Sequence, residues 1–153
     1  MKVEIVERPA IPLASVRHVG SYQGIREAFG RLNDLVTAAG LSKPDTMLVG
    51  IYHDDPSVTP EEKLRSDAAI TIPPKAKLPP GLTELVIPAG RYAHAVLIGP
   101  YTGLPDVYAH LRNEWLPRSG EKLGDGMSYE MYRNTPMTAK PHELVTDIYL
   151  SLK

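Results

Sequence analysis

One glutamate in this sequence stands in a setting that suits chemistry. Glu130 lies in the segment "SYEMY" with Tyr129, Met131 and Tyr132 as neighbours, so its carboxylate has apolar and aromatic company. A carboxylate that leaves water needs a hydrogen-bonding or charged partner, or its pKa rises. Among tyrosine rings it would attract an organic cation or hydrogen-bond a polar ligand. Glu130 is therefore the first candidate for ligand binding; the alternative is a solvated glutamate at a strand edge.

The alternation of a strand decides which way Glu130 points. In "SYEMY", Tyr129 and Met131 share one face, while Glu130 and Tyr132 share the other. We expect the apolar pair to face the helix, so that Glu130 and Tyr132 point away from it, toward a cleft. The corresponding position in the first half of the chain is Gly50, which projects no side chain and would leave room for a ligand.

Other aromatic and acidic residues supply further candidates for the same site. Eight tyrosines stand against one tryptophan and one phenylalanine, and a tyrosine suits the wall of a half-wet pocket. Several candidates also have a structural alternative: Asp147 has an equivalent in Asp67 and could cap a turn, Tyr22 and Tyr101 could anchor helices, and Trp115 could be core. The expected ligand-binding residues are Glu130, Tyr132, Tyr149, Tyr52, Tyr22, Tyr101, Trp115 and Asp147.

Composition argues against several other classes of function. The five histidines show no ligand spacing such as His-x-x-x-His, and there is no cysteine, serine elbow or phosphate loop, so we expect no metal and no cofactor. The formal net charge is −1, without a basic cluster, which disfavours direct nucleic-acid binding. Glu4 and Glu7 interrupt the apolar N-terminus, and no stretch is long enough for a membrane span. We expect a cytoplasmic protein that does not enter membranes.

The segments that must position these residues occur twice in the sequence. The segment "HVGSYQGIREAFGRL" at 18–32 corresponds to "LIGPYTGLPDVYAHL" at 97–111, with glycines, a tyrosine and a leucine at the same spacing. Farther along, Tyr52 matches Tyr132 at one constant offset with its neighbours. Chance would not preserve spacing across two segments, so we infer an internal duplication. Apolar periodicity predicts strand, helix, strand and strand in each copy, at 13–20, 23–40, 46–53, 66–72, 91–99, 103–116, 127–134 and 143–152.

The two copies predict one domain over residues 1–153. The first half covers about 1–72, the proline-rich segment 73–81 is a linker, and the second half covers about 82–153. A lone half buries too little apolar area, so the halves should pack together about a pseudo-twofold axis. The predicted fold is α+β, with two tandem strand-helix-strand-strand modules whose antiparallel sheets enclose a central cleft, and ligand sites favour such junctions.

Four segments carry a family resemblance: "DDPSVTPEEKLRSDAAITIP" at 54–73, "GPYTGLPDVYAHLRNEWLPRSG" at 99–120, "SYEMYRNTP" at 128–136 and "ELVTDIYLSL" at 143–152. They resemble the GyrI-like family, the DNA gyrase inhibitor fold that is shared by effector-binding domains of AraC- and MerR-type multidrug-sensing regulators. The resemblance covers almost the whole chain. It implies two modules around a ligand cleft, with the glutamate of the E-x-Y strand, here Glu130, contacting the ligand. In the regulators such pockets take up lipophilic, often cationic compounds.

The resemblance leaves the function open between classes. No helix-turn-helix stands ahead of the domain, so we expect likeness to stand-alone members, some described as gyrase inhibitors or toxin-protecting proteins. We favour a small-molecule binding protein over an enzyme. One alternative is a hydrolase of reactive toxic natural products, in which Glu130 acts with Asp147 or Tyr132 to position water. The other is inhibition of DNA gyrase through the outer surface. The expected partner is a small-molecule ligand, with DNA gyrase or a separate regulator as the alternative protein partner.

Overall fold

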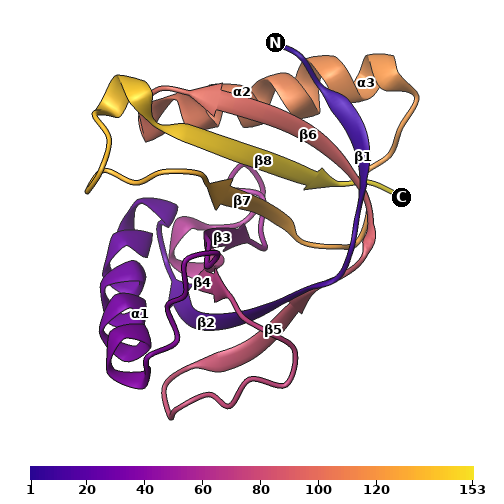
Figure 1. The fold of residues 1–153 in the computed structure, drawn as a ribbon. Coiled ribbons are helices and arrows are strands. Elements are labelled where there is room, and N and C mark those ends of the chain that lie inside the picture. Colours follow the sequence, from indigo (N-terminus) through magenta and orange to yellow (C-terminus); the bar gives the residue numbers. More distant parts are fainter. The chain divides into compact units, whose positions relative to one another are not determined.

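Strand, helix, strand and strand follow one another twice along the chain, as the sequence predicts, and each copy begins with one further strand (Figure 1). This order is that of a computed structural model, which describes residues 1–153. The first copy comprises β1 (Glu4–Arg8), β2 (Ile11–Val19), α1 (Ile25–Ala39), β3 (Leu48–Tyr52) and β4 (Arg65–Thr71). The second comprises β5 (Thr83–Ile87), β6 (Gly90–Ile98), α2 (Leu104–His110), α3 (Leu116–Ser119), β7 (Ser128–Tyr132) and β8 (Val145–Ser151). A π-helical turn, η4 (Leu111–Trp115), joins α2 to α3.

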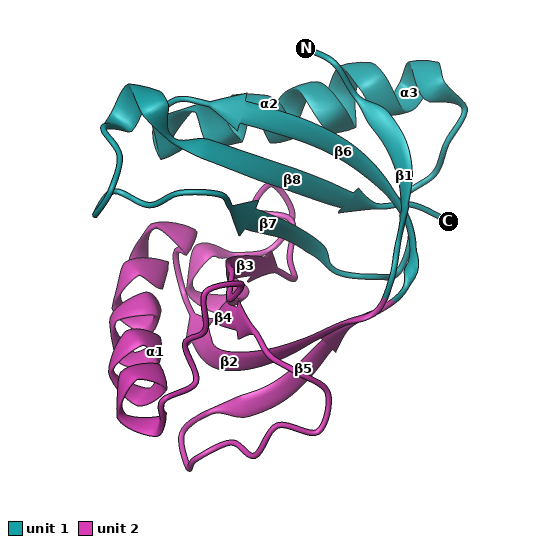
Figure 2. Ribbon diagram, viewed as in Figure 1, with its two compact units in different colours: residues 1–9, 89–153 teal, residues 10–88 magenta.

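The chain forms two compact units, shown in different colours in Figure 2. Unit 1 contains residues 1–9 and 89–153, and its strands run β1-β6-β8-β7 across an antiparallel sheet. Unit 2 contains residues 10–88, with the antiparallel order β3-β4-β2-β5. Helices and antiparallel sheets in tandem units confirm the predicted α+β class.

Each unit takes one strand from the other copy of the repeat. β1 pairs with β6, and β5 pairs with β2, over five register positions each. The chain passes between units next to Pro9 and Pro88, each of which is followed by an alanine. The bounds of the units therefore differ from the halves 1–72 and 82–153, because the halves follow sequence order and the units follow strand pairing. Residues 73–81 form neither helix nor strand and lie in unit 2.

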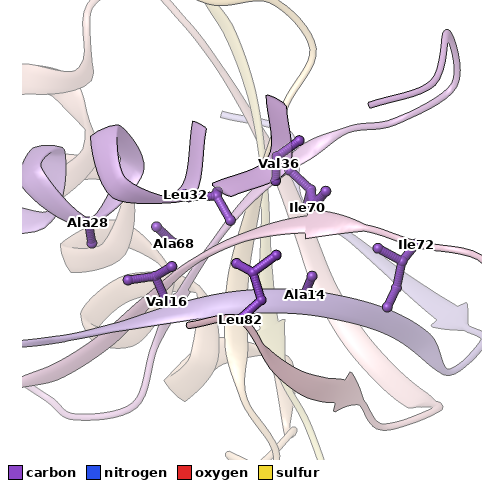
Figure 3. Close-up of a cluster of buried hydrophobic side chains, with 9 residues drawn as sticks. All are labelled: Ala14, Val16, Ala28, Leu32, Val36, Ala68, Ile70, Ile72 and Leu82. Atoms are coloured by element: carbon purple, nitrogen blue, oxygen red, sulfur yellow. The ribbon is translucent and has the colours of Figure 1, made fainter. Parts of the chain in front are cut away.

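In unit 2 the helix α1 buries one stripe against the sheet. Ala28, Leu32 and Val36 recur at every fourth position, so they fall on one face of the helix, and all three are buried. The helix ends at Gly40, whose φ of +63° is the left-handed conformation that glycine adopts without strain. Figure 3 shows the resulting core, in which the helix packs on β2 and β4. Its buried members are Ala14, Val16, Ala28, Leu32, Val36, Ala68, Ile70, Ile72 and Leu82.

In unit 1 the helical segment from α2 to α3 covers one face of the β6–β8 part of the sheet (Figure 1). Val107 and Leu111 point into this core, and β6 and β8 supply alternate residues to it, as expected for strands with one face toward a helix. The buried members are Ala93, Ala95, Val107, Leu111, Ile148, Leu150 and Leu152.

The turns that lead into the helices repeat as well. The amide of Gly20 donates to the carbonyl of Leu64, and the amide of Gly99 donates to the carbonyl of Leu144, both at 2.8 Å. The φ angles of these glycines, +120° and +135°, exclude most other residues. Equal bonds at equivalent positions support the internal duplication. None of the helices combines the length and apolar character that crossing a membrane would require.

Candidate ligand-binding site

Strand β7 turns Glu130 toward the helix. Glu130 lies directly opposite Ile148 on β8, and Ile148 belongs to the core beneath α2. Residues that lie opposite each other in an antiparallel pair share a face of the sheet. The prediction that Glu130 and Tyr132 face away from the helix is therefore wrong. Tyr129 and Met131 occupy the face that the helix leaves uncovered.

The prediction fails because both faces of β7 are buried. Tyr129 and Met131 are buried, as Glu130 is, so the more apolar pair is removed from water without facing the helix. A strand that is buried on both sides does not reveal its orientation by alternation. The register with β8 decides it, through the pairs Glu130 with Ile148 and Tyr129 with Tyr149.

The Glu130 carboxylate is fully enclosed and has a hydrogen-bond partner at each oxygen. Glu130 is only 1% exposed. The hydroxyl of Tyr108, from α2, donates to Oε2 at 2.7 Å, and the hydroxyl of Tyr132, from the same strand, donates to Oε1 at 2.8 Å. Burial raises the pKa of Glu130 to about 7, while the two hydrogen bonds act in the opposite direction. The group can therefore hold or release a proton near neutral pH.

Tyr101 extends the aromatic wall of this site. Its ring meets that of Tyr132 edge to face, with centroids 5.6 Å apart. Burial raises the pKa of the Tyr101 hydroxyl, and the nearby charge of Glu130 adds to the effect. Tyr101, Tyr108, Tyr132 and Glu130 thus form one polar and aromatic group, which we call the Glu130 cluster.

Tyr22 and Tyr52 form the equivalent pair in unit 2. Their rings meet edge to face at 4.9 Å. The Tyr22 hydroxyl donates to the carbonyl of Asp54 at 2.6 Å and accepts from the amide of the same residue at 2.9 Å. These bonds tie the turn before α1 to the segment after β3, which is the anchoring role that the sequence left open for Tyr22.

Asp147 and Tyr149 lie on the opposite face of the sheet from Glu130. Asp147 pairs in register with Met131, and Tyr149 pairs with Tyr129, so neither shares a face with the Glu130 cluster. The sequence predicts both residues in the same site as Glu130, and the strand register places them on the other side of the sheet instead. Asp147 and Tyr149 stand two residues apart on β8, so they share one face of the sheet, and that face is the one opposite Glu130.

Asp147 on β8 binds a histidine of β6 and the arginine that directly follows β7. Arg133 donates to both of its carboxylate oxygens at 2.6 Å, and Nε2 of His94 lies 2.7 Å from Oδ1. Burial acts to raise the pKa of Asp147, but the hydrogen bonds from Arg133 and His94 outweigh it and lower the pKa. Asp67 in unit 2 is likewise held by one arginine and one histidine, but Arg17 reaches a single oxygen from β2, and it is His53 that stands at the position equivalent to Arg133. The repeated arrangement supports a structural role for both aspartates.

Tyr149 belongs to an aromatic row that crosses the sheet of unit 1. Its ring stacks on Tyr129 at 4.7 Å and on His94 at 4.8 Å, because these residues are opposite each other on β7, β8 and β6. The guanidinium of Arg8, from β1, lies over the Tyr149 ring at 4.6 Å and donates to the Tyr129 hydroxyl at 3.2 Å. The row binds strand β1 to the rest of the unit.

Trp115 is a core residue of unit 1, whereas Tyr108 reaches the candidate site. Trp115 is half-buried and packs against the unit 1 core, which matches its structural alternative. Tyr108 also packs there, yet its hydroxyl reaches Glu130. Sequence analysis did not select Tyr108 as a site residue. Its position on the apolar stripe of the helix, one residue after Val107, was the available signal. No three acidic or histidine side chains gather into a metal-binding group.

Comparison with known proteins places this buried carboxylate and its tyrosines in a family. The family described as "GyrI-like small molecule binding domain" matches residues 1–153. The chain therefore belongs to the GyrI-like family, which confirms the resemblance, and is a small-molecule binding domain.

Individual relatives share most of their length with this chain. A DNA gyrase inhibitor of Yersinia enterocolitica is 31% identical over 139 residues, covering 88% of this chain and 87% of the relative. The crystal structure of the EcmrR C-terminal domain superposes with a TM-score of 0.84 at 20% identity, covering 99% of this chain and 97% of that one. The structure of SAV2435 bound to tetraphenylphosphonium has a TM-score of 0.70 at 12% identity, covering 100% and 94%. At these identities the two structures show likeness of fold.

Proposed function

We propose that the Glu130 cluster binds lipophilic, cationic small molecules, with the Glu130 carboxylate as the group that attracts the positive charge. The observation that carries the proposal is the enclosure of this carboxylate between two tyrosine hydroxyls. Neither donor carries a charge, so the negative charge of the ionised group is not cancelled by its partners. A cation brought close would find an opposite charge in a medium of low polarity, where the attraction is strong.

The aromatic rings supply the second half of the recognition. Tyr101 and Tyr132 meet edge to face and are both only partly buried, and tyrosine rings attract apolar groups and positive charge. The solved complex of SAV2435 with tetraphenylphosphonium gives one example of such a ligand in a protein of this fold. We infer the same ligand class for this chain from its own carboxylate and rings.

Glu130→Gln tests the proposal directly. Calorimetric titration at pH 8 compares tetraphenylphosphonium with triphenylphosphine oxide, a neutral compound with similar rings. A hydrogen-bonded charge contributes about 1.5–3 kcal/mol, so the cation should bind at least about tenfold more weakly to the variant. The neutral compound should change little. Glu114→Gln is the matched control, since Glu114 carries the same charge on the exposed side of η4. Equal loss for both compounds, or equal effects of both substitutions, would contradict the proposal.

The same variant separates the two alternative functions. A carboxyl with a pKa of about 7 suits general acid–base work, which favours hydrolysis as the second candidate. Turnover of a strained electrophile that Glu130→Gln abolishes would establish an enzyme. A relative is named DNA gyrase inhibitor, so gyrase supercoiling is the third readout. Inhibition that survives Glu130→Gln would place that activity on the outer surface, apart from the Glu130 cluster.

A further inference from the structure

We propose that Arg112 sets the charge preference of this site, because its guanidinium occupies the ring face of Tyr108 and competes there with positively charged ligands. The inference rests on the proposed function, since it concerns the same cluster. It adds a residue outside the Glu130 cluster that selects between cationic and neutral ligands.

The contact links Arg112 to the buried carboxylate through one side chain. Arg112 follows Tyr108 by four residues, so the two lie one above the other on the helical segment. The guanidinium carbon of Arg112 is 5.4 Å from the centre of the Tyr108 ring, within the range of a cation–π contact. The hydroxyl at the far end of the same ring donates to Glu130 at 2.7 Å. Tyr108 therefore holds a carboxylate at its hydroxyl and a cation over its face.

The local helix supports this placement. Arg112 lies in η4, the π-helical turn that directly follows α2, and such turns occur frequently at functional sites. Arg112 and Tyr108 are both half-buried, so neither side chain extends freely into solvent. An arginine keeps its charge at every accessible pH. A positively charged guanidinium therefore lies over one ring face of Tyr108.

A resident cation affects ligands according to their charge. A positively charged ligand that approaches Tyr108 must displace the guanidinium from the ring or tolerate a like charge nearby, and both reduce its affinity. A neutral aromatic ligand meets neither penalty. Arg112 therefore weakens the preference for cations over neutral ligands that Glu130 creates. A repulsive group in the site thus contributes to its specificity.

Arg112→Gln is compared with Arg118→Gln to test this. Arg118 lies in α3, is exposed, and loses the same charge on substitution. Titration with tetraphenylphosphonium at pH 8 should show binding to Arg112→Gln that is about three- to tenfold tighter than to wild type, which corresponds to the energy of one cation–π contact. Triphenylphosphine oxide should bind all three proteins alike, and Arg118→Gln should match wild type.

A third variant guards against a change in folding. Arg112→Lys keeps the charge and should bind the cation with nearly wild-type affinity, while thermal unfolding reports whether each variant is folded. Equal or weaker cation binding by Arg112→Gln than by Arg118→Gln would overturn the proposal. If wild type binds the cation and loses it on Glu130→Gln, but Arg112→Gln changes nothing, only the role of Arg112 fails. If neither wild type nor any variant binds either compound, the proposed function fails with it.

Discussion

At the scale of single residues, the proton on Glu130 couples folding to pH. Its ordinary pKa of 4.5 is raised to about 7 by burial in the folded protein. Between these values the folded chain keeps a proton that the unfolded chain has lost. The stability that this group contributes is therefore complete below pH 4.5, falls as the pH rises toward 7 and stays level above it. A shift of this size corresponds to a loss on the order of 3 kcal/mol.

Urea unfolding of wild type and Glu130→Gln across pH 4.5 to 8 measures this loss. The glutamine cannot ionise, so subtracting its free energy of unfolding from that of wild type removes the contribution of all other groups. The difference should fall by a few kcal/mol over the range, with most of the change between pH 5 and 7. Glu84→Gln, at an exposed carboxylate on β5, should give a nearly flat difference. Parallel curves for Glu130→Gln and wild type would show that Glu130 is ionised normally.

The residues of the cluster differ in how far sequence could predict them. Glu130 and Tyr132 stand two apart on a strand, so their common face followed from alternation alone. Which side of the sheet that face occupies depended on the pairing of Glu130 with Ile148, and pairing between separate strands is not visible in the spacing of either one. The bond from Tyr108 was hidden for the same reason. Once β7 is turned toward the helix, a tyrosine on the helical stripe becomes its natural partner.

At the scale of elements, one crowded glycine and one glycine with open space around it test how tightly the neighbouring segments pack. Gly124 lies beside the end of β8, where an added Cβ would come within 2.6 Å of the Leu152 carbonyl oxygen. Gly30 lies inside α1, where a Cβ would meet nothing within 4 Å. Gly124→Ala should therefore destabilise the protein by about 1 kcal/mol or more, because backbone must move. Gly30→Ala should stabilise it by about 0.5–1 kcal/mol through helix propensity.

Chemical denaturation with coincident fluorescence and circular dichroism compares the two alanine variants. Opposite signs are the expected result. A loss of stability in Gly30→Ala would mean that α1 does not have the open surface found at that position, and an unchanged Gly124→Ala would mean that the segment beside Leu152 is loosely held.

The elements themselves were predicted in proportion to their periodicity. Long apolar stripes identified both helical segments, and the strands with a helix on one face were found near their true bounds. β1 and β5 were not predicted. Each has only five residues, and each pairs along one side with a strand from the other copy of the repeat. Their partners lie more than 65 residues away in the sequence, about the length of a whole repeat, so local pattern carries little information about them.

At the scale of the whole molecule, exchange of first strands makes each unit depend on both copies of the repeat. Unit 1 takes β1 from the N-terminal end of the chain, and the contacts of Arg8 with Tyr129, Met131 and Tyr149 fix it there. A duplication whose copies exchange strands cannot lose one copy and leave the other intact. We therefore expect the two similar segments to fold together as a single unit.

The exchange makes a defined covalent prediction, because the chain contains no cysteine of its own. Ile5 on β1 lies opposite Ala93 on β6, so Ile5→Cys together with Ala93→Cys should form a disulfide within one chain. A loop of this length would add up to about 4 kcal/mol of stability by restricting the unfolded chain. Under non-reducing electrophoresis the oxidised protein should migrate as a monomer, and its thermal midpoint should fall on reduction. The pair Ile5→Cys with Ile98→Cys is the control: both residues are exposed and lie in unit 1, but Ile98 stands five register positions beyond the partner of Ile5, about 16 Å along β6, so the pair should remain reduced under the same mild oxidation. A disulfide-linked dimer of the first pair would instead show that β1 completes the sheet of a second copy, which would make the assembly of unit 1 intermolecular.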